Sequence, residues 1–245
     1  MSQIRVHSYE SMGTFDGPGL RLVVFLQGCP FRCLYCANPD TIDPVGEAEL
    51  TDADHILRMA VEQKPFFGKR GGITFSGGEP TVQARELLPL FERLREQEIH
   101  ICLDTNGTIV SADVDRLHDL TDIVLLDVKQ INDARHRALT GRSNANTLLT
   151  ARRLRDRGKD VWLRYVLVPG ISDDPTDIAA WADEFATFGN IRRVELLPYH
   201  TLGVHKYAAM GLDYALKDTP RNTPGQLEAA RAMLAERFAC PVIVN

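Results

Sequence analysis

The feature that most constrains the fold is a regular alternation of short apolar runs with longer amphipathic segments. The runs are rich in β-branched residues and have the length of buried strands. Strands that alternate with helices form parallel sheets, because each return to the same edge needs a crossover connection. The apolar runs occupy residues 20–28, 71–78, 99–107, 122–130, 161–170 and 192–200, with a shorter one at 241–244.

The segments beside these runs carry apolar residues at a spacing of three to four, which is typical of amphipathic helices. Six strand–helix units are too few for a closed eight-stranded barrel, so we expect an α/β fold, a partial (βα)6 TIM-type barrel with parallel strands. An open doubly wound sheet is the alternative. We also expect one domain over residues 1–245, because no repeat, linker or low-complexity tract interrupts the sequence. Examples of these helical segments are residues 53–63, 83–97, 177–189 and 224–238.

Polar or glycine-rich residues stand where the expected strands end. In parallel barrels the carboxyl ends of the strands open onto one face, where catalytic groups gather. The sequence therefore predicts a site at the C-terminal ends of the strands. The residues concerned are Cys29, Ser76 to Glu79, Asp104 to Asn106, Asp127, Lys129 and His200.

The charge balance and the hydropathy argue against two classes of partner. The chain has 28 basic and 33 acidic residues, and its formal charge of −5 argues against binding nucleic acid. No run reaches the roughly 18 apolar residues of a membrane span, and the N-terminus carries no apolar signal region. We therefore expect no membrane partner and a cytoplasmic location. The densest basic run, residues 151–159, indicates the solvated face of a helix, with a protein-docking surface as the alternative.

The cysteines are odd in number and unevenly placed. Three of the five, Cys29, Cys33 and Cys36, lie within eight positions. Structural zinc takes four ligands, so a zinc site would need a distant residue such as His7. A [4Fe–4S] cluster held by three thiolates leaves one iron open to another ligand. Cysteines that only fill the core are the third alternative, and this is the role we expect for Cys102 and Cys240.

The segment CPFRCLYC, residues 29–36, resembles the CxxxCxxC signature of the radical S-adenosylmethionine enzymes. The resemblance implies that Cys29, Cys33 and Cys36 ligate one [4Fe–4S] cluster. It also implies that the open iron binds S-adenosylmethionine, and that one electron cleaves this cofactor to a 5′-deoxyadenosyl radical.

A second segment, SGGEP, resembles the GGE motif of the same enzymes and ends the second expected strand. The resemblance assigns Gly77, Gly78 and Glu79 to the amino group of the cofactor's methionine part. Without it, two glycines after a strand indicate an ordinary turn.

Five segments in order resemble a narrower family, the pyruvate formate-lyase activating enzymes. They are residues 7–29, 102–107, 125–133, 164–174 and 197–211. The resemblance implies an anaerobic enzyme that generates a glycyl radical on pyruvate formate-lyase. It also implies an electron donor, reduced flavodoxin or ferredoxin, and we expect the chain to be a monomer.

The resemblance assigns further residues to the cofactor and to a monovalent cation. Two residues apart in a strand share a face, so the carboxylate of Asp127 and the ammonium of Lys129 can meet a zwitterionic ligand together. A structural ion pair is the alternative for these two residues. The residues for the cation are Asp104, Thr105, Asp127 and the main chain of Leu125, and those for the cofactor include Asp104, Asp127, Val128 and Lys129.

Four more residues complete the expected cofactor site. Arg164 lies inside a strand, where a buried arginine needs a carboxylate partner, and it is a second candidate for the methionine carboxylate. The resemblance places His200 beside the ribose and adenine, although a histidine at a strand end is often an ordinary polar contact. The resemblance also implies that Tyr35 and Ala37 flank the cluster and offer their main chain to the adenine.

Two other functions stay open. The chain could activate another glycyl radical enzyme or act on a small molecule by the same radical chemistry. It could instead be a non-catalytic zinc or iron–sulfur sensing module. Two segments have no firm role: FDGPG, residues 15–19, is a turn or the border of a partner groove, and residues 200–211 could form a lid.

Overall fold

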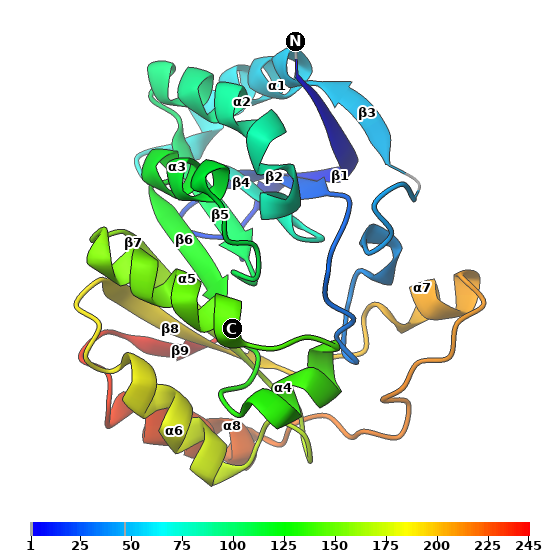
Figure 1. Cartoon of the computed structure of the whole chain (residues 1–245), viewed down its shortest axis with the longest axis vertical. Coiled ribbons are helices and arrows are strands. Elements are labelled where there is room, and N and C mark those ends of the chain that lie inside the picture. Colours follow the sequence, from blue (N-terminus) through cyan, green and yellow to red (C-terminus); the bar gives the residue numbers. More distant parts are fainter. Residues whose placement is uncertain (1, 47) are drawn as a thin grey trace. The chain divides into compact units, whose positions relative to one another are not determined.

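The computed structural model describes residues 2–46 and 48–245 (Figure 1). Contacts between residues divide the chain into two compact units. Unit 1 comprises the chain up to Pro30 together with Asp40–Leu125, and unit 2 comprises Phe31–Pro39 and Leu126–Asn245. The boundary therefore crosses the cysteine segment. The single domain over residues 1–245 stays a prediction.

Unit 1 has its strands in the order β3-β1-β2-β4-β5. The parallel strands are β2 (Arg21–Leu26), β4 (Gly72–Gly77) and β5 (His100–Thr105), as the apolar runs predict. The sequence analysis missed two antiparallel strands, β1 (Gln3–Gly13) and β3 (Glu49–Asp52). They were missed because buried and exposed residues are mixed along them, whereas only continuous apolar runs were counted as strands.

In unit 1, one helix follows the antiparallel strand β3, and two others follow the parallel strands β4 and β5. They are α1 (Ala53–Phe67), α2 (Ala84–Glu96) and α3 (Ala112–Leu120), with a short 3-10 turn η2 (Pro80–Gln83) before α2. Buried aliphatic and aromatic side chains of these helices and strands form one core. Within that core the rings of Phe75 and Phe91 lie 4.7 Å apart.

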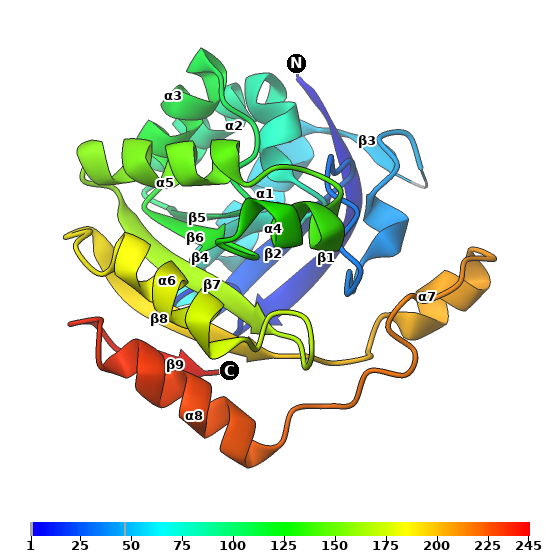
Figure 2. The same cartoon turned by 60° about the horizontal axis from the view of Figure 1, so that its bottom comes forward.

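Unit 2 is a parallel sheet with helices on it. Its strands include β7 (Asp160–Leu167), β8 (Ile191–Pro198) and β9 (Val242–Val244). Besides the boundary in the cysteine segment, strand β6 (Ile123–Asp127) contains a second boundary between the units, and a short 3-10 turn η1 (Pro39–Thr41) contains a third. Figure 2 shows α6 and α8 beside these strands. The helices are α4 (Asp133–Thr140), α5 (Ala145–Asp156), α6 (Pro175–Phe185), α7 (Val204–Ala209) and α8 (Pro224–Ala235).

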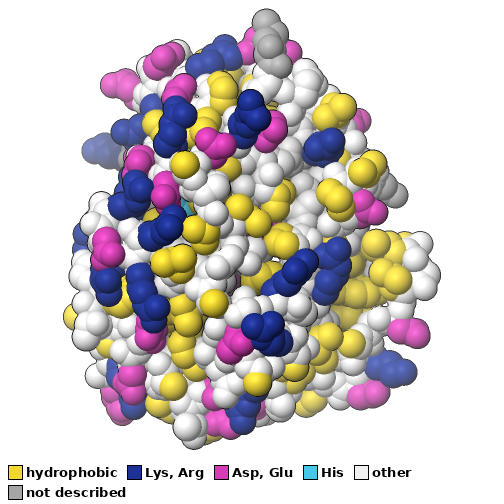
Figure 3. Space-filling model, viewed as in Figure 1, with side chains coloured by type: hydrophobic (Ala, Val, Ile, Leu, Met, Phe, Trp, Pro, Cys, Tyr) yellow, Lys and Arg dark blue, Asp and Glu magenta, His cyan; other side chains and the backbone are white. Residues whose placement is uncertain are grey.

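The α/β class with mostly parallel strands is confirmed, and it is consistent with the partial barrel that the sequence predicts. All seven apolar runs contain strands, whose ends lie within three residues of the expected positions. No helix among the described residues is long and apolar enough to cross a membrane. Basic and acidic side chains are interspersed on the face shown in Figure 3, in keeping with the small net charge of −5.

Candidate active site

The three clustered cysteines do not all belong to the same unit. Cys29 is in unit 1, three residues after β2, and Cys33 and Cys36 are in unit 2. All three are only partly buried. The N–H of Cys36 donates to the carbonyl of Cys33 over 3.0 Å and closes a tight turn between these two thiols.

In unit 1, the GGE segment is bound to the main chain that leads to Cys29. Strands β2 and β4 are parallel with Leu26 opposite Gly77. The N–H of Gly78 donates to the carbonyl of Leu26, and that of Glu79 donates to the carbonyl of Gly28, both over 2.8 Å. The segment after β4 therefore determines the path of the chain just before Cys29.

Both glycines are required by this close approach. A Cβ added at Gly78 would lie 2.4 Å from the carbonyl oxygen of Gly28. Gly77 has a φ of +101°, and a Cβ there would lie 2.5 Å from the nitrogen of Leu26. Any larger side chain would push the two segments apart. The contact of these glycines with the cofactor stays a prediction.

Glu79 is completely buried, and both of its carboxylate oxygens accept hydrogen bonds. Its Oε1 accepts from the hydroxyls of Thr81 and Thr105, each over 2.6 Å. Its Oε2 accepts from the N–H of Asn106 over 2.7 Å. Burial raises the pKa of Glu79, and these donors oppose that rise. The carboxylate thus connects the GGE segment to the segment that follows β5.

Asn106 extends this network to a cysteine, a role that the sequence analysis missed. The side-chain amide of Asn106 donates to Cys29 Sγ over 3.8 Å. The only sequence signal was its position directly after a strand. Beside it, the hydroxyl of Ser76 donates to Asp104 Oδ2 over 2.7 Å, which orients the carboxylate predicted to meet cofactor and cation.

In unit 2, the C-terminal end of α4 supports one side of the cysteine segment. The N–H of Arg32 donates to the carbonyl of Thr140 over 2.8 Å, and that of Leu34 donates to the carbonyl of Leu139 over 3.0 Å. Carbonyls in the last turn of a helix lack partners within the helix. Here the cysteine segment supplies them, so α4 holds the segment in place on both sides of Cys33.

Helix α7 supports the other side of the segment. The hydroxyl of Tyr207 donates to the carbonyl of Cys36 over 3.1 Å. The ammonium of Lys206 donates to Asn38 Oδ1 over 2.9 Å. The sequence analysis gave a lid as one role for residues 200–211. In the structure, these residues include two side chains that hold the cysteine segment in place.

Ala37 also packs closely against this segment, at Gly203. A Cβ added at Gly203 would lie 2.3 Å from the carbonyl oxygen of Ala37, so only glycine fits there. Because the side chain of Ala37 is a single methyl group, its main chain is the part that can bind a ligand. The proposed adenine contact of Ala37 stays a prediction.

Replacing Tyr207 by phenylalanine is expected to loosen the segment at Cys36. The variant loses one neutral hydrogen bond, worth about 1 kcal/mol, which corresponds to a roughly five-fold faster loss of iron to a chelator. Iron release followed by absorbance measures this. The matched control is Tyr214→Phe, whose hydroxyl pairs with that of Tyr199 over 2.9 Å instead. Equal iron release from the two variants would contradict the assignment.

Lys129 Nζ and Asp127 Oδ2 form an ion pair of 2.9 Å. This is the structural ion pair that the sequence analysis gave as the alternative to a shared ligand contact. Burial lowers the pKa of Lys129, but Asp127, Tyr35 and Cys33 more than offset it and raise that pKa well above its ordinary value. The ammonium lies 5.6 Å from the centre of the Tyr35 ring. Both charged side chains keep some exposure, so a ligand can still reach the pair.

Val128 orients this pair through its main chain. Its carbonyl accepts from the indole N–H of Trp181 over 3.0 Å, and its N–H donates to the carbonyl of Arg164 over 3.2 Å. The residue itself is buried. It therefore determines the direction in which the chain leaves β6, between Asp127 and Lys129.

Arg164 has the carboxylate partner that its burial requires. Its Nε donates to Glu195 Oε2 over 2.9 Å, and the two residues are opposite each other in the parallel pair β7 and β8. The sequence predicted a partner but did not identify it. His200 follows β8 and is exposed, and partial burial lowers its pKa. Its contact with the ribose stays a prediction.

Comparisons with known proteins identify the family. A family profile described as "Radical SAM superfamily" matches residues 23–182. The "Pyruvate formate-lyase 1-activating enzyme" of Escherichia coli (strain K12) is 44% identical over 234 residues, 91% of this chain and 95% of that protein. The chain belongs to the radical SAM superfamily, among the pyruvate formate-lyase-activating enzymes. The "Pyruvate formate-lyase-activating enzyme" of Staphylococcus aureus (strain USA300) is 41% identical over 244 residues, 97% of each chain.

Two solved structures share the fold. A domain of the pyruvate-formate lyase-activating enzyme from Bacteroides vulgatus is 22% identical, with a TM-score of 0.60 over 71% of this chain and 99% of that one. Streptococcus suis SuiB bound to S-adenosylmethionine is 14% identical, with a TM-score of 0.72 over 93% of this chain and 50% of that one. At these identities the likeness concerns the fold alone.

Membership of the superfamily implies a [4Fe–4S] cluster and S-adenosylmethionine. The residues present fit this group. Three thiols within eight residues of the chain are partly exposed, and none is in a disulfide. The donor set is thiolate only, as iron–sulfur clusters require. Main-chain hydrogen bonds hold the segment before Cys29 in unit 1 and the segment around Cys33 and Cys36 in unit 2.

Proposed function

We propose that this chain activates pyruvate formate-lyase by generating a glycyl radical on the backbone of that enzyme. The observation that carries the proposal is the 44% identity, over 91% of the chain, to a curated activating enzyme. The chain is an enzyme of the radical SAM type, with one [4Fe–4S] cluster and S-adenosylmethionine. When bound, these groups supply the 5′-deoxyadenosyl radical that removes a hydrogen atom from a glycine Cα.

The protein's own residues bind the cluster and the cofactor and orient them. We propose that Cys29, Cys33 and Cys36 hold the cluster, and that Lys129 and Arg164 hold the methionine carboxylate. The raised pKa of Lys129 keeps it a cation in this role. Arg164 brings its own counter-ion, Glu195, so its guanidinium direction is set before a ligand arrives. The other proposed cofactor contacts are Tyr35, Cys36, Ala37, Gly77, Gly78, Glu79, Asp104, Asp127, Val128 and His200.

We also propose a monovalent cation near the cofactor. Its oxygens would come from the side chains of Asp104, Thr105 and Asp127 and from the main chain of Leu125. Carboxylate, hydroxyl and carbonyl oxygens are the ligands that hard cations prefer. The support for this site is the oxygen chemistry of these residues together with the family resemblance.

Three further expectations concern the setting of the reaction. We propose that the chain works as a monomer in the cytoplasm, and that reduced flavodoxin or ferredoxin supplies the electron. An electron from outside is required because each reductive cleavage of the cofactor consumes one electron, which the protein's own side chains do not supply.

An anaerobic activation assay tests the function. Purified protein, S-adenosylmethionine and a reductant are mixed with pyruvate formate-lyase whose glycines carry deuterium at Cα. We expect a glycyl signal in electron paramagnetic resonance, about one radical per active site, and one deuterium in the 5′-deoxyadenosine formed. The measurements are spin counting and mass spectrometry.

Two controls separate the rival functions. Without pyruvate formate-lyase, no glycyl signal is expected. Deoxyadenosine that forms in its presence, but without deuterium or a glycyl signal, would instead favour another glycyl radical enzyme or a small molecule as substrate. No deoxyadenosine under any condition would favour the sensing module.

A further inference from the structure

We propose that Arg193 is a positioning residue for the cofactor site and acts through Glu195 on Arg164. The proposal rests on the proposed function, in which Arg164 holds the carboxylate of the cofactor's methionine part. It adds a residue that the sequence analysis did not single out. Arg193 itself would not touch the cofactor, because its effect reaches the ligand only through the other two side chains.

The three charged side chains lie on one face of the sheet of unit 2. In the parallel pair β7 and β8, Arg164 is opposite Glu195, and Trp162 is opposite Arg193. Residues two apart in a strand point to the same face, so these four side chains are neighbours. The other face of β7 packs against α6. A side chain of β8 can therefore act directly on one of β7.

The carboxylate of Glu195 is buried between two guanidinium groups. Glu195 is 1% exposed, and its Oε2 accepts from Arg164 Nε over 2.9 Å. Its Oε1 lies 3.5 Å from Arg193 Nη1 and has no hydrogen-bond partner among the described residues. Burial of a carboxylate oxygen is costly unless its charge is compensated. The ion pair with Arg193 is therefore what compensates Oε1.

The guanidinium of Arg193 is held in turn by an aromatic ring. Its central carbon lies 3.9 Å from the centre of the ring of Trp162, which is buried. A planar guanidinium that stacks on an indole has a fixed direction, and a lysine ammonium cannot stack in the same way. The direction of the ion pair between Arg193 and Glu195 is therefore set by Trp162.

Loss of Arg193 would change how Glu195 binds Arg164. Carboxylates and guanidinium groups favour bidentate pairs, in which both oxygens accept from two N–H groups. With Arg193 present, Glu195 binds Arg164 through Oε2 and Nε, while Oε1 is paired with the second arginine. Without Arg193, an Nη group of Arg164 is the nearest donor that can compensate Oε1. That donor would then turn towards β8 instead of towards the ligand.

The main chain of Arg164 is fixed independently of this group. Its carbonyl accepts from the N–H of Val128 over 3.2 Å, just after β6. Val128 stands between Asp127 and Lys129, whose ion pair of 2.9 Å does not involve β8. Removal of Arg193 should therefore redirect the side chain of Arg164 and leave its main chain in place.

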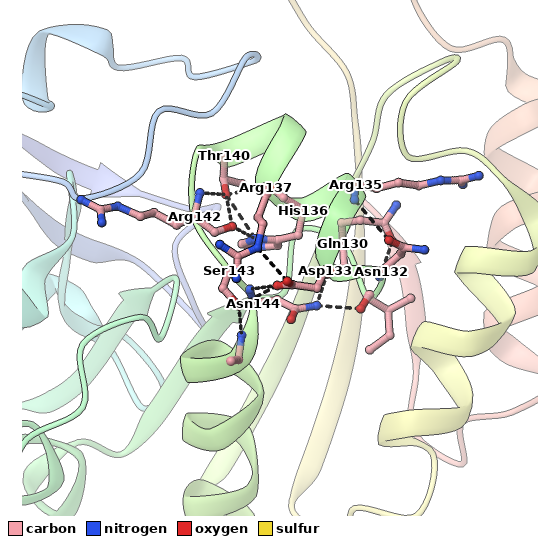
Figure 4. A network of polar contacts seen from close by, with 12 residues as sticks. Gln130, Asn132, Asp133, Arg135, His136, Arg137, Thr140, Arg142, Ser143 and Asn144 are labelled. Atoms are coloured by element: carbon pink, nitrogen blue, oxygen red, sulfur yellow. Dashed lines mark hydrogen bonds and ion pairs between the residues drawn. The ribbon is translucent and has the colours of Figure 1, made fainter.

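The polar network on α4 shows how a local network differs from this one (Figure 4). Asp133 accepts from the hydroxyl of Ser143 over 2.6 Å and from the N–H of Asn144 over 3.0 Å. Arg137 Nε donates to the same carboxylate over 2.7 Å. These donors lie on α4 or between α4 and α5, so they fix that turn. The contacts of Arg193 instead lead to a residue proposed to bind the cofactor.

Replacing Arg193 by glutamine tests the proposal with two ligands. Holoenzyme is titrated anaerobically with S-adenosylmethionine and with decarboxylated S-adenosylmethionine, which lacks the carboxylate proposed to meet Arg164. We expect Arg193→Gln to weaken binding of the first ligand about ten-fold and to leave binding of the second unchanged. Arg193→Lys keeps the charge but not the stacking, so it should recover part of the affinity. Isothermal titration calorimetry measures each affinity.

Arg192→Gln is the matched control, because it removes the neighbouring arginine of β8. Arg192 pairs with Asp160 over 2.7 Å, and both side chains are exposed. We expect both affinities to stay unchanged in this variant. The same holds for Arg137→Gln, which removes the arginine from the network on α4. Urea unfolding of all variants shows whether each is folded.

Equal weakening of both ligands by Arg193→Gln would overturn the proposal, because a general loss of structure does not single out a carboxylate. No change with either ligand, or the same change in Arg192→Gln, would overturn it as well. Failure of the proposed function gives a different result. The unmodified chain would then bind S-adenosylmethionine but give no glycyl signal with pyruvate formate-lyase, and the two titrations do not depend on that signal.

Discussion

Replacing Cys33 by alanine is expected to abolish cluster binding and deoxyadenosine formation while the chain stays folded. Cys33 lies in a segment held by main-chain hydrogen bonds on both sides, so its side chain is not needed for the local structure. A cluster with only two protein thiolates loses the ligand count on which the open iron depends. Anaerobic iron and sulfide analysis, together with chromatography of the deoxyadenosine, measures the effect, and both readings should fall to background.

Cys102→Ala is the matched control for this prediction. Cys102 is completely buried in β5 and does not belong to the cysteine segment. Its variant should keep iron, sulfide and deoxyadenosine formation. Normal deoxyadenosine formation by Cys33→Ala would make the cluster assignment wrong. About one zinc and no sulfide in the unmodified chain would favour the sensing module.

Replacing Glu79 by alanine is expected to destabilise unit 1 more than most single substitutions. The variant leaves the N–H groups of Thr81 and Asn106 without their acceptor in a fully buried place. Each orphaned donor costs about 1–3 kcal/mol, so the total is about 2–6 kcal/mol. That is a large part of the roughly 5–15 kcal/mol by which native proteins are stable. Urea unfolding measures the loss.

Glu92→Ala is the control, since it removes the same carboxylate from the exposed face of α2. Glu92 pairs with Arg116 over 3.2 Å, and both side chains are at least half exposed. Such a pair contributes about 0–1 kcal/mol. Amide exchange at Asn106 should accelerate in Glu79→Ala and stay unchanged in Glu92→Ala. If the two variants lose equal stability, Glu79 is not the connection between the two segments.

The strands could be predicted from the sequence because buried parallel strands read as continuous apolar runs. The same criterion failed for β1 and β3, whose side chains face solvent on much of their length. Helix α7 was also missed. It has six residues and none is buried, so its sequence carries no amphipathic signal.

The candidate site also contains features that the sequence predicted and contacts that it did not. Residue types at short spacing were readable: three cysteines for a cluster, two glycines where chains approach closely, and a carboxylate and an ammonium two residues apart. Partners distant in the sequence were not. Nothing in the chain near Arg164 indicates Glu195, and nothing near Cys36 indicates Tyr207, because each pair is brought together by strand register or by helix packing.

The sequence by itself determined the α/β class, the thiolate donor set and the family, since these depend on residue type, periodicity and order along the chain. Only the tertiary structure decided what those residues do for one another. Glu79 is a buried connection between two strand ends, and the end of α4 holds the main chain on both sides of Cys33. The physical reason is that hydrogen bonds and burial act over a few ångströms in space, whatever the separation in sequence.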